Sequence, residues 1–174
     1  MFDHRVPFDS YSATYMTLRN TNIEETGYQF VSQTGYMKEI FVDPDGLIEN
    51  VRSTLSHENV EYDTFVGSGL SAALILPRLA TALDCAWAVV RKKSEGSHSC
   101  NEIEGTIGER WVFFDDLIET GETWHRVQKA VYDNLRHQRL RASYVGAVTY
   151  SWEVTYWSVG REPVDPEFKF EYDE

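Results

Sequence analysis

Residues 111–123 have the sequence Trp-Val-Phe-Phe-Asp-Asp-Leu-Ile-Glu-Thr-Gly-Glu-Thr. Four apolar residues at the start predict a buried strand, and two adjacent acids, Asp115 and Asp116, follow it directly. Residues 122–137 then carry apolar side chains on one face at helical spacing. The stretch therefore predicts a strand, a short loop and a helix. The acids fall at the carboxyl end of the strand, where open α/β sheets bind their ligands.

Further apolar segments extend this pattern in both directions. Residues 64–66, 86–90 and 143–150 predict three more strands, and residues 47–57 and 70–83 predict helices. Continuous apolar strands that alternate with helices indicate a parallel sheet that is covered on both faces. The predicted fold class is therefore α/β, with a mostly parallel twisted sheet and helices on both of its faces.

The N-terminal part of the chain has a different pattern. Residues 28–31 and 37–42 predict two strands of a hairpin. No internal repeat and no Pro/Ser-rich linker interrupts the sequence, so we predict a single domain over residues 1–174. Its core covers about 46–150, and a small hood is formed by about 1–45 together with the C-terminal segment.

Charge and composition exclude several classes of protein. The chain has 174 residues, with 16 Lys and Arg against 28 Asp and Glu, for a formal net charge of −12. A general binder of nucleic acid or of an anionic membrane is not expected, because the field of the protein repels polyanions. No apolar run approaches the roughly 20 residues of a membrane span. Two cysteines make no disulfide framework, so we expect a reducing, cytoplasmic environment.

The residue types in the 111–123 stretch suit a phosphorylated sugar. Carboxylate oxygens of Asp115 and Asp116 only accept hydrogen bonds, so they suit vicinal hydroxyls or the water shell of a metal ion. Thr120, Gly121 and Thr123 supply hydroxyls and backbone N–H groups at a helix start, which form a phosphate cradle. One loop would therefore hold a sugar by its diol and by its phosphate. The alternative is that the two acids merely cap a helix.

This stretch resembles the phosphoribosyl-pyrophosphate signature of type I phosphoribosyltransferases, in which an apolar strand, two acids and two apolar residues precede x-Thr-Gly-x-Thr. The resemblance implies that Asp115 and Asp116 bind the ribose 2- and 3-hydroxyls and contact Mg²⁺ only through the substrate. Glu119 would either handle a proton of the base or lie exposed at the helix start. The 5-phosphate would bind the segment that contains Glu119, Thr120, Gly121, Glu122 and Thr123.

A second segment resembles the first pyrophosphate loop of that family. Gly67, Ser68 and Gly69 follow a predicted strand, and glycine lets backbone approach an anion closely. The same glycines with Ala72 also fit a dinucleotide-binding fingerprint. That alternative expects an acid about 20 residues further on. The second strand ends instead at Arg91.

A basic cluster follows that second strand. Arg91, Lys92 and Lys93 precede a polar segment that contains His98, and this resembles the catalytic loop of the orotate branch. The resemblance implies that Arg91 and Lys92 bind pyrophosphate, while Lys93 and His98 act in catalysis as charge develops on the leaving group. The loop Lys of the orotate branch has no counterpart, because Glu95 stands near its place. The alternative is a solvated basic strand end.

Two regions are candidates for contact with the base. Gln33 stands nearest a Lys of the orotate enzymes, and its lack of charge makes orotate itself doubtful. Trp152, Tyr156 and Trp157 follow the fourth predicted strand and suit stacking on a base. Their alternation equally suits a strand that packs at the sheet edge, which is the interpretation we favour.

The resemblance predicts a Mg²⁺-dependent phosphoribosyltransferase that transfers a 5-phosphoribosyl group from phosphoribosyl pyrophosphate to a nucleobase and releases pyrophosphate. It also implies a homodimer. His98 stands one residue further from Arg91 than its counterpart in the orotate branch, and the loop Lys is missing. These two departures leave a second possibility, a regulator that binds phosphoribosyl pyrophosphate or a nucleotide without catalysis. A dinucleotide-binding protein is the third.

Overall fold

The computed structural model describes residue 40 and residues 42–92, 101–151 and 153–160. All of them belong to one unit, Tyr36–Glu174. The predicted strand at 28–31, most of the predicted hood and the C-terminal tail lie outside the described residues. The elements in chain order are α4 (Pro44–His57), β1 (Thr64–Ser68), α5 (Gly69–Leu83), β2 (Ala86–Val90), β3 (Ile103–Gly105), β4 (Arg110–Asp115), α6 (Glu122–Gln138), β5 (Ser143–Thr149) and β6 (Thr155–Ser158).

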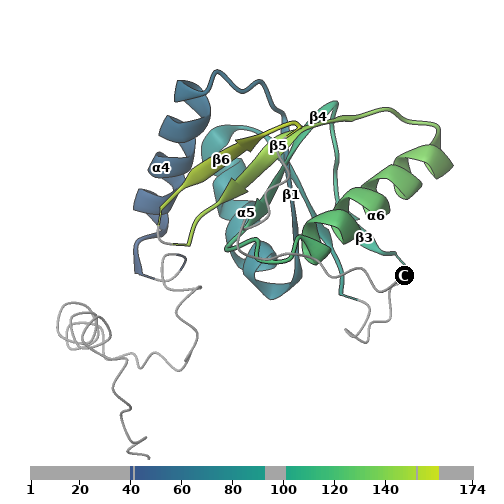
Figure 1. Cartoon of the computed structure of the whole chain (residues 1–174), viewed down its shortest axis with the longest axis horizontal. Coiled ribbons are helices and arrows are strands. Elements are labelled where there is room, and N and C mark those ends of the chain that lie inside the picture. The colour runs from purple at the N-terminus through teal and green to yellow at the C-terminus, as the bar shows by residue number, and fades with distance from the viewer. Residues whose placement is uncertain (1–39, 41, 93–100, 152, 161–174) are drawn as a thin grey trace, which may run out of the picture. The chain divides into compact units, whose positions relative to one another are not determined.

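The described strands form one sheet in the order β3-β2-β1-β4-β5-β6 (Figure 1). The four central strands, β2, β1, β4 and β5, are parallel to one another. The two edge strands, β3 and β6, pair antiparallel with β2 and β5. The predicted α/β fold with a mostly parallel sheet is therefore confirmed.

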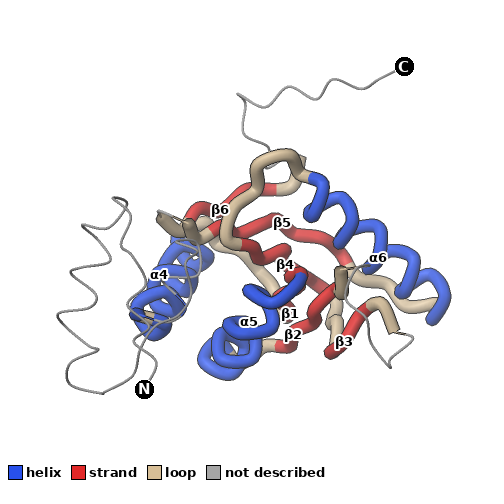
Figure 2. Tube along the Cα trace, turned by 90° about the horizontal axis from the view of Figure 1, so that it is seen from below, coloured by secondary structure: helices blue, strands red, loops and turns tan. Residues whose placement is uncertain are grey.

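Helices cover both faces of this sheet, as predicted (Figure 2). Strand β4 shows why, because its side chains alternate between two apolar clusters. Val112 and Phe114 lie in the cluster under α4 and α5, while Trp111 and Phe113 lie in the cluster under α6. A strand that is buried on both sides needs a continuous apolar run. None of the helices in the described part of the chain is long and apolar enough to cross a membrane.

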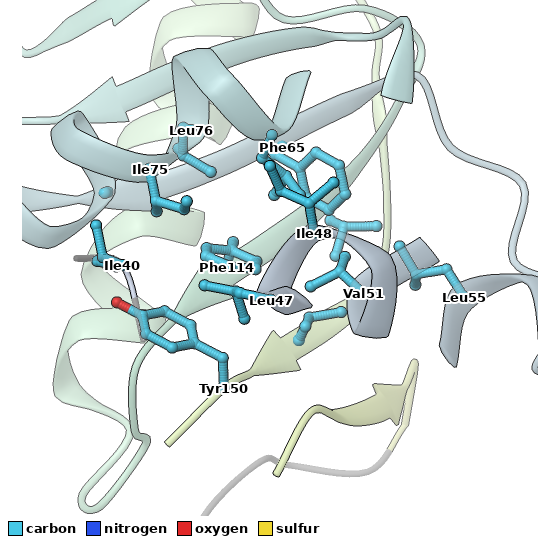
Figure 3. Packing of buried hydrophobic residues seen from close by; sticks show 14 of the residues in the cluster. Ile40, Leu47, Ile48, Val51, Leu55, Phe65, Ile75, Leu76, Phe114 and Tyr150 are labelled. Carbon is cyan, nitrogen blue, oxygen red and sulfur yellow. The ribbon is translucent and has the colours of Figure 1, made fainter. Parts of the chain in front are cut away.

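Aromatic side chains form the centre of the α4/α5 cluster (Figure 3). Phe114 stacks on Tyr150, with ring centroids 5.0 Å apart, and meets the Phe65 ring edge-on at 5.8 Å. Leu47 and Val51 of α4 pack over them and are buried. This packing fixes the part of β4 that directly precedes the two acids.

The start of α4 differs from the prediction. The helix begins at Pro44, three residues before the predicted start, because the Asp43 carboxylate accepts a hydrogen bond of 2.9 Å from the N–H of Gly46. Ile40 and Val42 are also helical, so the strand predicted over 37–42 is wrong at these two residues. A short apolar run does not distinguish a strand from a helical turn.

Strand β3 falls in a polar segment for which the sequence predicts no regular element. It pairs with β2 over three residues, from Ala88↔Gly105 to Val90↔Ile103. Gly105 has a φ of +119°, and a Cβ there would lie 2.3 Å from the Trp87 carbonyl oxygen. The close pairing at this edge therefore requires glycine.

Truncation of Phe114 tests the importance of this packing. We expect Phe114→Ala to lower the free energy of unfolding by about 3–5 kcal/mol, because it leaves a cavity between two aromatic rings and α4. Tyr132→Ala is the control, since Tyr132 is 64% exposed and its loss should cost less than about 0.5 kcal/mol. Urea unfolding measures both, and equal losses in the two variants would contradict the assignment.

Candidate functional site

The sheet order places a ligand-binding crevice between β1 and β4. From β1 the chain continues outward to β2, whereas from β4 it continues to β5 on the opposite side. Parallel α/β sheets bind ligands at such a switch point, outside the carboxyl ends of the strands. The loops that meet there are Gly67–Gly69 after β1 and residues 115–123 after β4.

A cavity of about 280 Å³ opens at the end of β4. It holds both acids and every residue that the sequence assigns to the 5-phosphate site. The lining residues are Asp115, Asp116, Leu117, Ile118, Glu119, Thr120, Gly121, Glu122, Thr123 and Trp124.

The first turn of α6 provides the donors in this cavity. Gly121 is the N-cap residue, with a φ of +76°, and as a glycine it has no side chain that could cap the helix. The Thr120 hydroxyl accepts a long contact of 3.4 Å from the N–H of Glu122, and the N–H of His125 donates to the Gly121 carbonyl at 2.8 Å. The N–H groups of the turn between them point out of the helix end, toward an incoming anion.

Glycines after β1 bring a lysine close to the same corner. A Cβ at Gly69, where φ is +70°, would lie 2.8 Å from Cε of Lys92, so the Lys92 side chain passes directly over this glycine. The positive charge of Lys92 also acts on Asp115 and opposes the rise of its pKa. Gly69, Lys92 and Asp115 therefore share one region, although they belong to the ends of three different strands, β1, β2 and β4.

Asp115 is the buried member of the acidic pair. It is 8% exposed, and its Oδ1 accepts a hydrogen bond of 3.1 Å from the N–H of Asp116. Burial first, and then the hydrogen bond and negative charge of the Asp116 side chain, together raise the pKa of Asp115 to about 8. At neutral pH the protonated form of Asp115 is therefore favoured in the free protein. A carboxyl group with a strongly shifted pKa in a crevice is a frequent mark of a functional site.

The turn after β5 holds the second acid in place. The Asp116 carbonyl accepts hydrogen bonds from the N–H of Tyr150, at 3.2 Å, and of Ser151, at 2.8 Å. The Asp116 side chain itself is half-buried and lines the cavity. The two strands on this side of the switch point therefore both support the acidic corner.

Arg126 of α6 is a contact that the sequence analysis misses. Its Nη2 donates to the Ser68 hydroxyl at 2.7 Å, and its Nη1 donates to the Arg91 carbonyl at 3.1 Å. The Ser68 hydroxyl donates in turn to the Val90 carbonyl at 2.9 Å. A basic residue within the first turns of a predicted helix is the only sequence signal for this residue, and it does not reveal the partners.

The predicted aromatic base contacts lie away from the cavity lining. Tyr156 and Trp157 are part of edge strand β6. The Tyr156 hydroxyl donates to the Val145 carbonyl, and the Trp157 indole N–H donates to the Thr149 hydroxyl at 3.1 Å. Four other predicted site residues lie outside the described part of the chain. These are Gln33, Lys93, His98 and Trp152.

The donor set at the corner fits magnesium that is held mostly by a ligand. Asp115, Asp116, Glu119 and Glu122 offer oxygen only, which Mg²⁺ prefers. Among the residues that the structure describes, no three His, Cys, Asp or Glu side chains converge closely enough to hold a metal ion by themselves. Such an ion would take its ligands mostly from a bound molecule and from water, and the two aspartates would act on it through that molecule.

Comparisons with known proteins identify similar folds. No protein-family model matches the sequence, and no curated protein matches it either. Solved structures that are similar include orotate phosphoribosyltransferase from Aeropyrum pernix, with 16% identity, a TM-score of 0.47, and coverage of 59% of this chain and 55% of that one. Adenine phosphoribosyltransferase from Saccharomyces cerevisiae, complexed with D-DIAB and adenine, has 23% identity and a TM-score of 0.43, and the match covers 60% of this chain and 64% of that one. Adenine phosphoribosyltransferase from Rhodothermus marinus has 24% identity and a TM-score of 0.44, and the match covers 70% of this chain and 73% of that one.

The matched part thus spans less than two thirds of the Aeropyrum and Saccharomyces chains. The names of these solved structures are those of phosphoribosyltransferases, the kind of enzyme whose signature residues 111–123 resemble.

Replacement of Asp115 by asparagine tests the electrostatics of the corner. The folded pKa lies above the ordinary value of 3.8, so the folded chain keeps a proton that the unfolded chain releases. The stability that this proton gives is complete below about pH 4 and is lost as the pH rises to about 8. Asparagine does not titrate, so Asp115→Asn removes this pH-dependent loss of stability. We expect it to stabilise the protein at pH 9 by at least roughly 2 kcal/mol, or about 4–8 °C in Tm.

Thermal unfolding at pH 5 and pH 9 measures this effect, and the variant should gain little at pH 5. Glu109→Gln is the control, because it makes the same chemical change at an exposed position before β4. A parallel pH dependence in wild type and Asp115→Asn would contradict the raised pKa.

Proposed function

We propose that this chain is a phosphoribosyltransferase that transfers a 5-phosphoribosyl group from phosphoribosyl pyrophosphate to a nitrogen of a nucleobase. The observation that carries the proposal is the corner after β4. A carboxyl pair with one buried member and a helix start with glycine at its N-cap share one cavity there, at the switch point of a parallel sheet. The base, the homodimeric state and the cytoplasmic location are further parts of the proposal.

The two ends of the ribose phosphate match the two kinds of group in the cavity. Asp115 and Asp116 would accept hydrogen bonds from the ribose 2- and 3-hydroxyls. The backbone N–H groups of the first turn of α6 and the hydroxyls of Thr120 and Thr123 would donate to the 5-phosphate. The strand provides a rigid support for the acids, since Phe113 and Phe114 are completely buried directly before them.

The pyrophosphate group would extend toward the end of β1. The missing Cβ at Gly69 leaves room for the Lys92 side chain, which brings a positive charge to the end of β1. In the reaction the bond from C1 of the ribose to a pyrophosphate oxygen breaks, and its electron pair leaves with pyrophosphate. A bond forms between C1 and the base nitrogen, which loses its proton. Positive charge from Lys92 and Arg91 would stabilise the departing pyrophosphate.

Magnesium is expected because of the charge at the site. Two exposed carboxylates, Glu119 and Glu122, line the cavity beside the aspartate pair and would repel a phosphate group. Mg²⁺ bound to the donor supplies positive charge that offsets this repulsion and the charge that develops on pyrophosphate. Asp115 and Asp116 would orient the ribose oxygens that help to hold the ion.

A sensor of phosphoribosyl pyrophosphate is the second candidate. Glu122 lies at the first position of α6, inside the proposed phosphate cradle, where its charge weakens anion binding. Weak binding of the donor suits a protein that responds to its concentration without turnover. The sensor and the enzyme share the same corner and differ in whether pyrophosphate is released.

Binding and turnover of the donor test the proposal. We expect calorimetry to show that the protein binds phosphoribosyl pyrophosphate with Mg²⁺, and we expect pyrophosphate release with one member of a panel of purine and pyrimidine bases. The double variant Asp115→Asn/Asp116→Asn should lose about 100-fold or more in affinity, because it removes both carboxyl groups that would accept hydrogen bonds from the diol.

Glu109→Gln again serves as the control, and it should leave affinity unchanged. Wild-type affinity in the double variant would refute the site. Measurable donor binding with no pyrophosphate release from any base would reject the enzyme and leave the sensor.

A further inference from the structure

Arg126 connects the strands that carry the proposed pyrophosphate contacts. It lies on α6, five residues after Gly121, and its guanidinium donates to the Ser68 hydroxyl and to the Arg91 carbonyl. Ser68 is the last residue of β1, and Arg91 directly follows β2. One side chain therefore fixes the ends of two strands against the helix that begins at the phosphate cradle.

The contact set of Arg126 leaves its charge unneutralised. The oxygens that it contacts are a hydroxyl and a backbone carbonyl, which carry no formal charge. Among the ion pairs between described residues, none involves Arg126. A half-buried cation without a carboxylate partner is uncommon in a chain with a net charge of −12. Its positive potential extends toward the strand ends, because no carboxylate in the described part of the chain forms an ion pair with it.

The hydroxyl of Ser68 shows what the guanidinium controls. Ser68 is the N-cap residue of α5, yet its side chain does not cap that helix. The hydroxyl instead donates to the Val90 carbonyl and accepts from Arg126. The N–H groups at the start of α5 are therefore left without this internal partner, and they remain available to an anion at the end of β1.

We propose that Arg126 is a positioning residue for the pyrophosphate half of the donor. It holds the turn at Ser68 and Gly69 and the strand end at Arg91 at a fixed separation, and its charge assists the approach of the anion. This inference rests on the proposed function. It predicts that the two halves of the donor respond differently to changes at residue 126, because the ribose phosphate half binds at Asp115, Asp116 and the first turn of α6.

Two substitutions separate geometry from charge. Arg126→Lys keeps the positive charge but cannot donate from two branches of a planar fork. Arg126→Gln removes the charge but keeps an amide that donates to one oxygen. Arg136→Gln is the matched control, since Arg136 is exposed in the last turn of the same helix. Thermal unfolding of each variant shows which of them are folded.

Calorimetry with two probes, Mg²⁺-pyrophosphate and ribose 5-phosphate, supplies the measurement. We expect Arg126→Gln to weaken pyrophosphate binding about tenfold or more and Arg126→Lys to weaken it about threefold, because the lysine restores charge alone. Affinity for ribose 5-phosphate should stay within about twofold of wild type in both. Should Arg126→Gln fail to fold, the split between the probes in Arg126→Lys decides the question.

The possible failures are distinguishable. Wild-type protein that binds neither probe would overturn the proposed function and this inference with it. Wild-type protein that binds both probes, together with variants that lose both affinities equally or lose neither, would leave the proposed function standing and overturn the role of Arg126.

Discussion

A side chain at position 67 would have its Cβ 2.7 Å from the Phe114 carbonyl oxygen, so β1 and β4 pack at their present distance only because residue 67 is glycine. This close approach lies at the switch point, where the chain continues from β1 to β2 on one side of the sheet and from β4 to β5 on the other. The backbone at Gly69 and the corner at Asp115 consequently lie close together. A larger residue at 67 would separate them and would remove the geometry on which binding of a two-ended ligand depends.

The electrostatics of the crevice work against stability and in favour of binding. Asp115 is buried beside a second acid, and its pKa is raised to about 8, so its ionisation costs folding free energy. Such a cost is common where residues serve a ligand instead of the fold. The positive charge of Lys92, above Gly69, acts on this acidic corner, and Arg126 lies against Ser68 at the end of β1. A ligand with hydroxyls at one end and phosphates at both matches that arrangement, provided that a divalent cation accompanies it.

The sequence predicts the corner well because all its determinants are local. The apolar run, the paired acids and the Thr-Gly-x-Thr segment lie within residues 111–123, and the structure places the acids and that segment around one cavity at the end of the apolar strand. Arg126 has no such signal, because its partners are 35 and 58 residues away and become its neighbours only through the sheet order. Strand β3 is missed because three residues at an edge show no periodicity, and the helical Ile40 and Val42 because a short apolar run is ambiguous.

A crystal structure of the protein with phosphoribosyl pyrophosphate and Mg²⁺ tests the central claim most directly. The account predicts the ribose hydroxyls within hydrogen-bonding distance of the Asp115 and Asp116 carboxylates, and the 5-phosphate against the backbone N–H groups of Thr123 and its neighbours. An empty corner at saturating donor, or a donor bound elsewhere on the molecule, would contradict it.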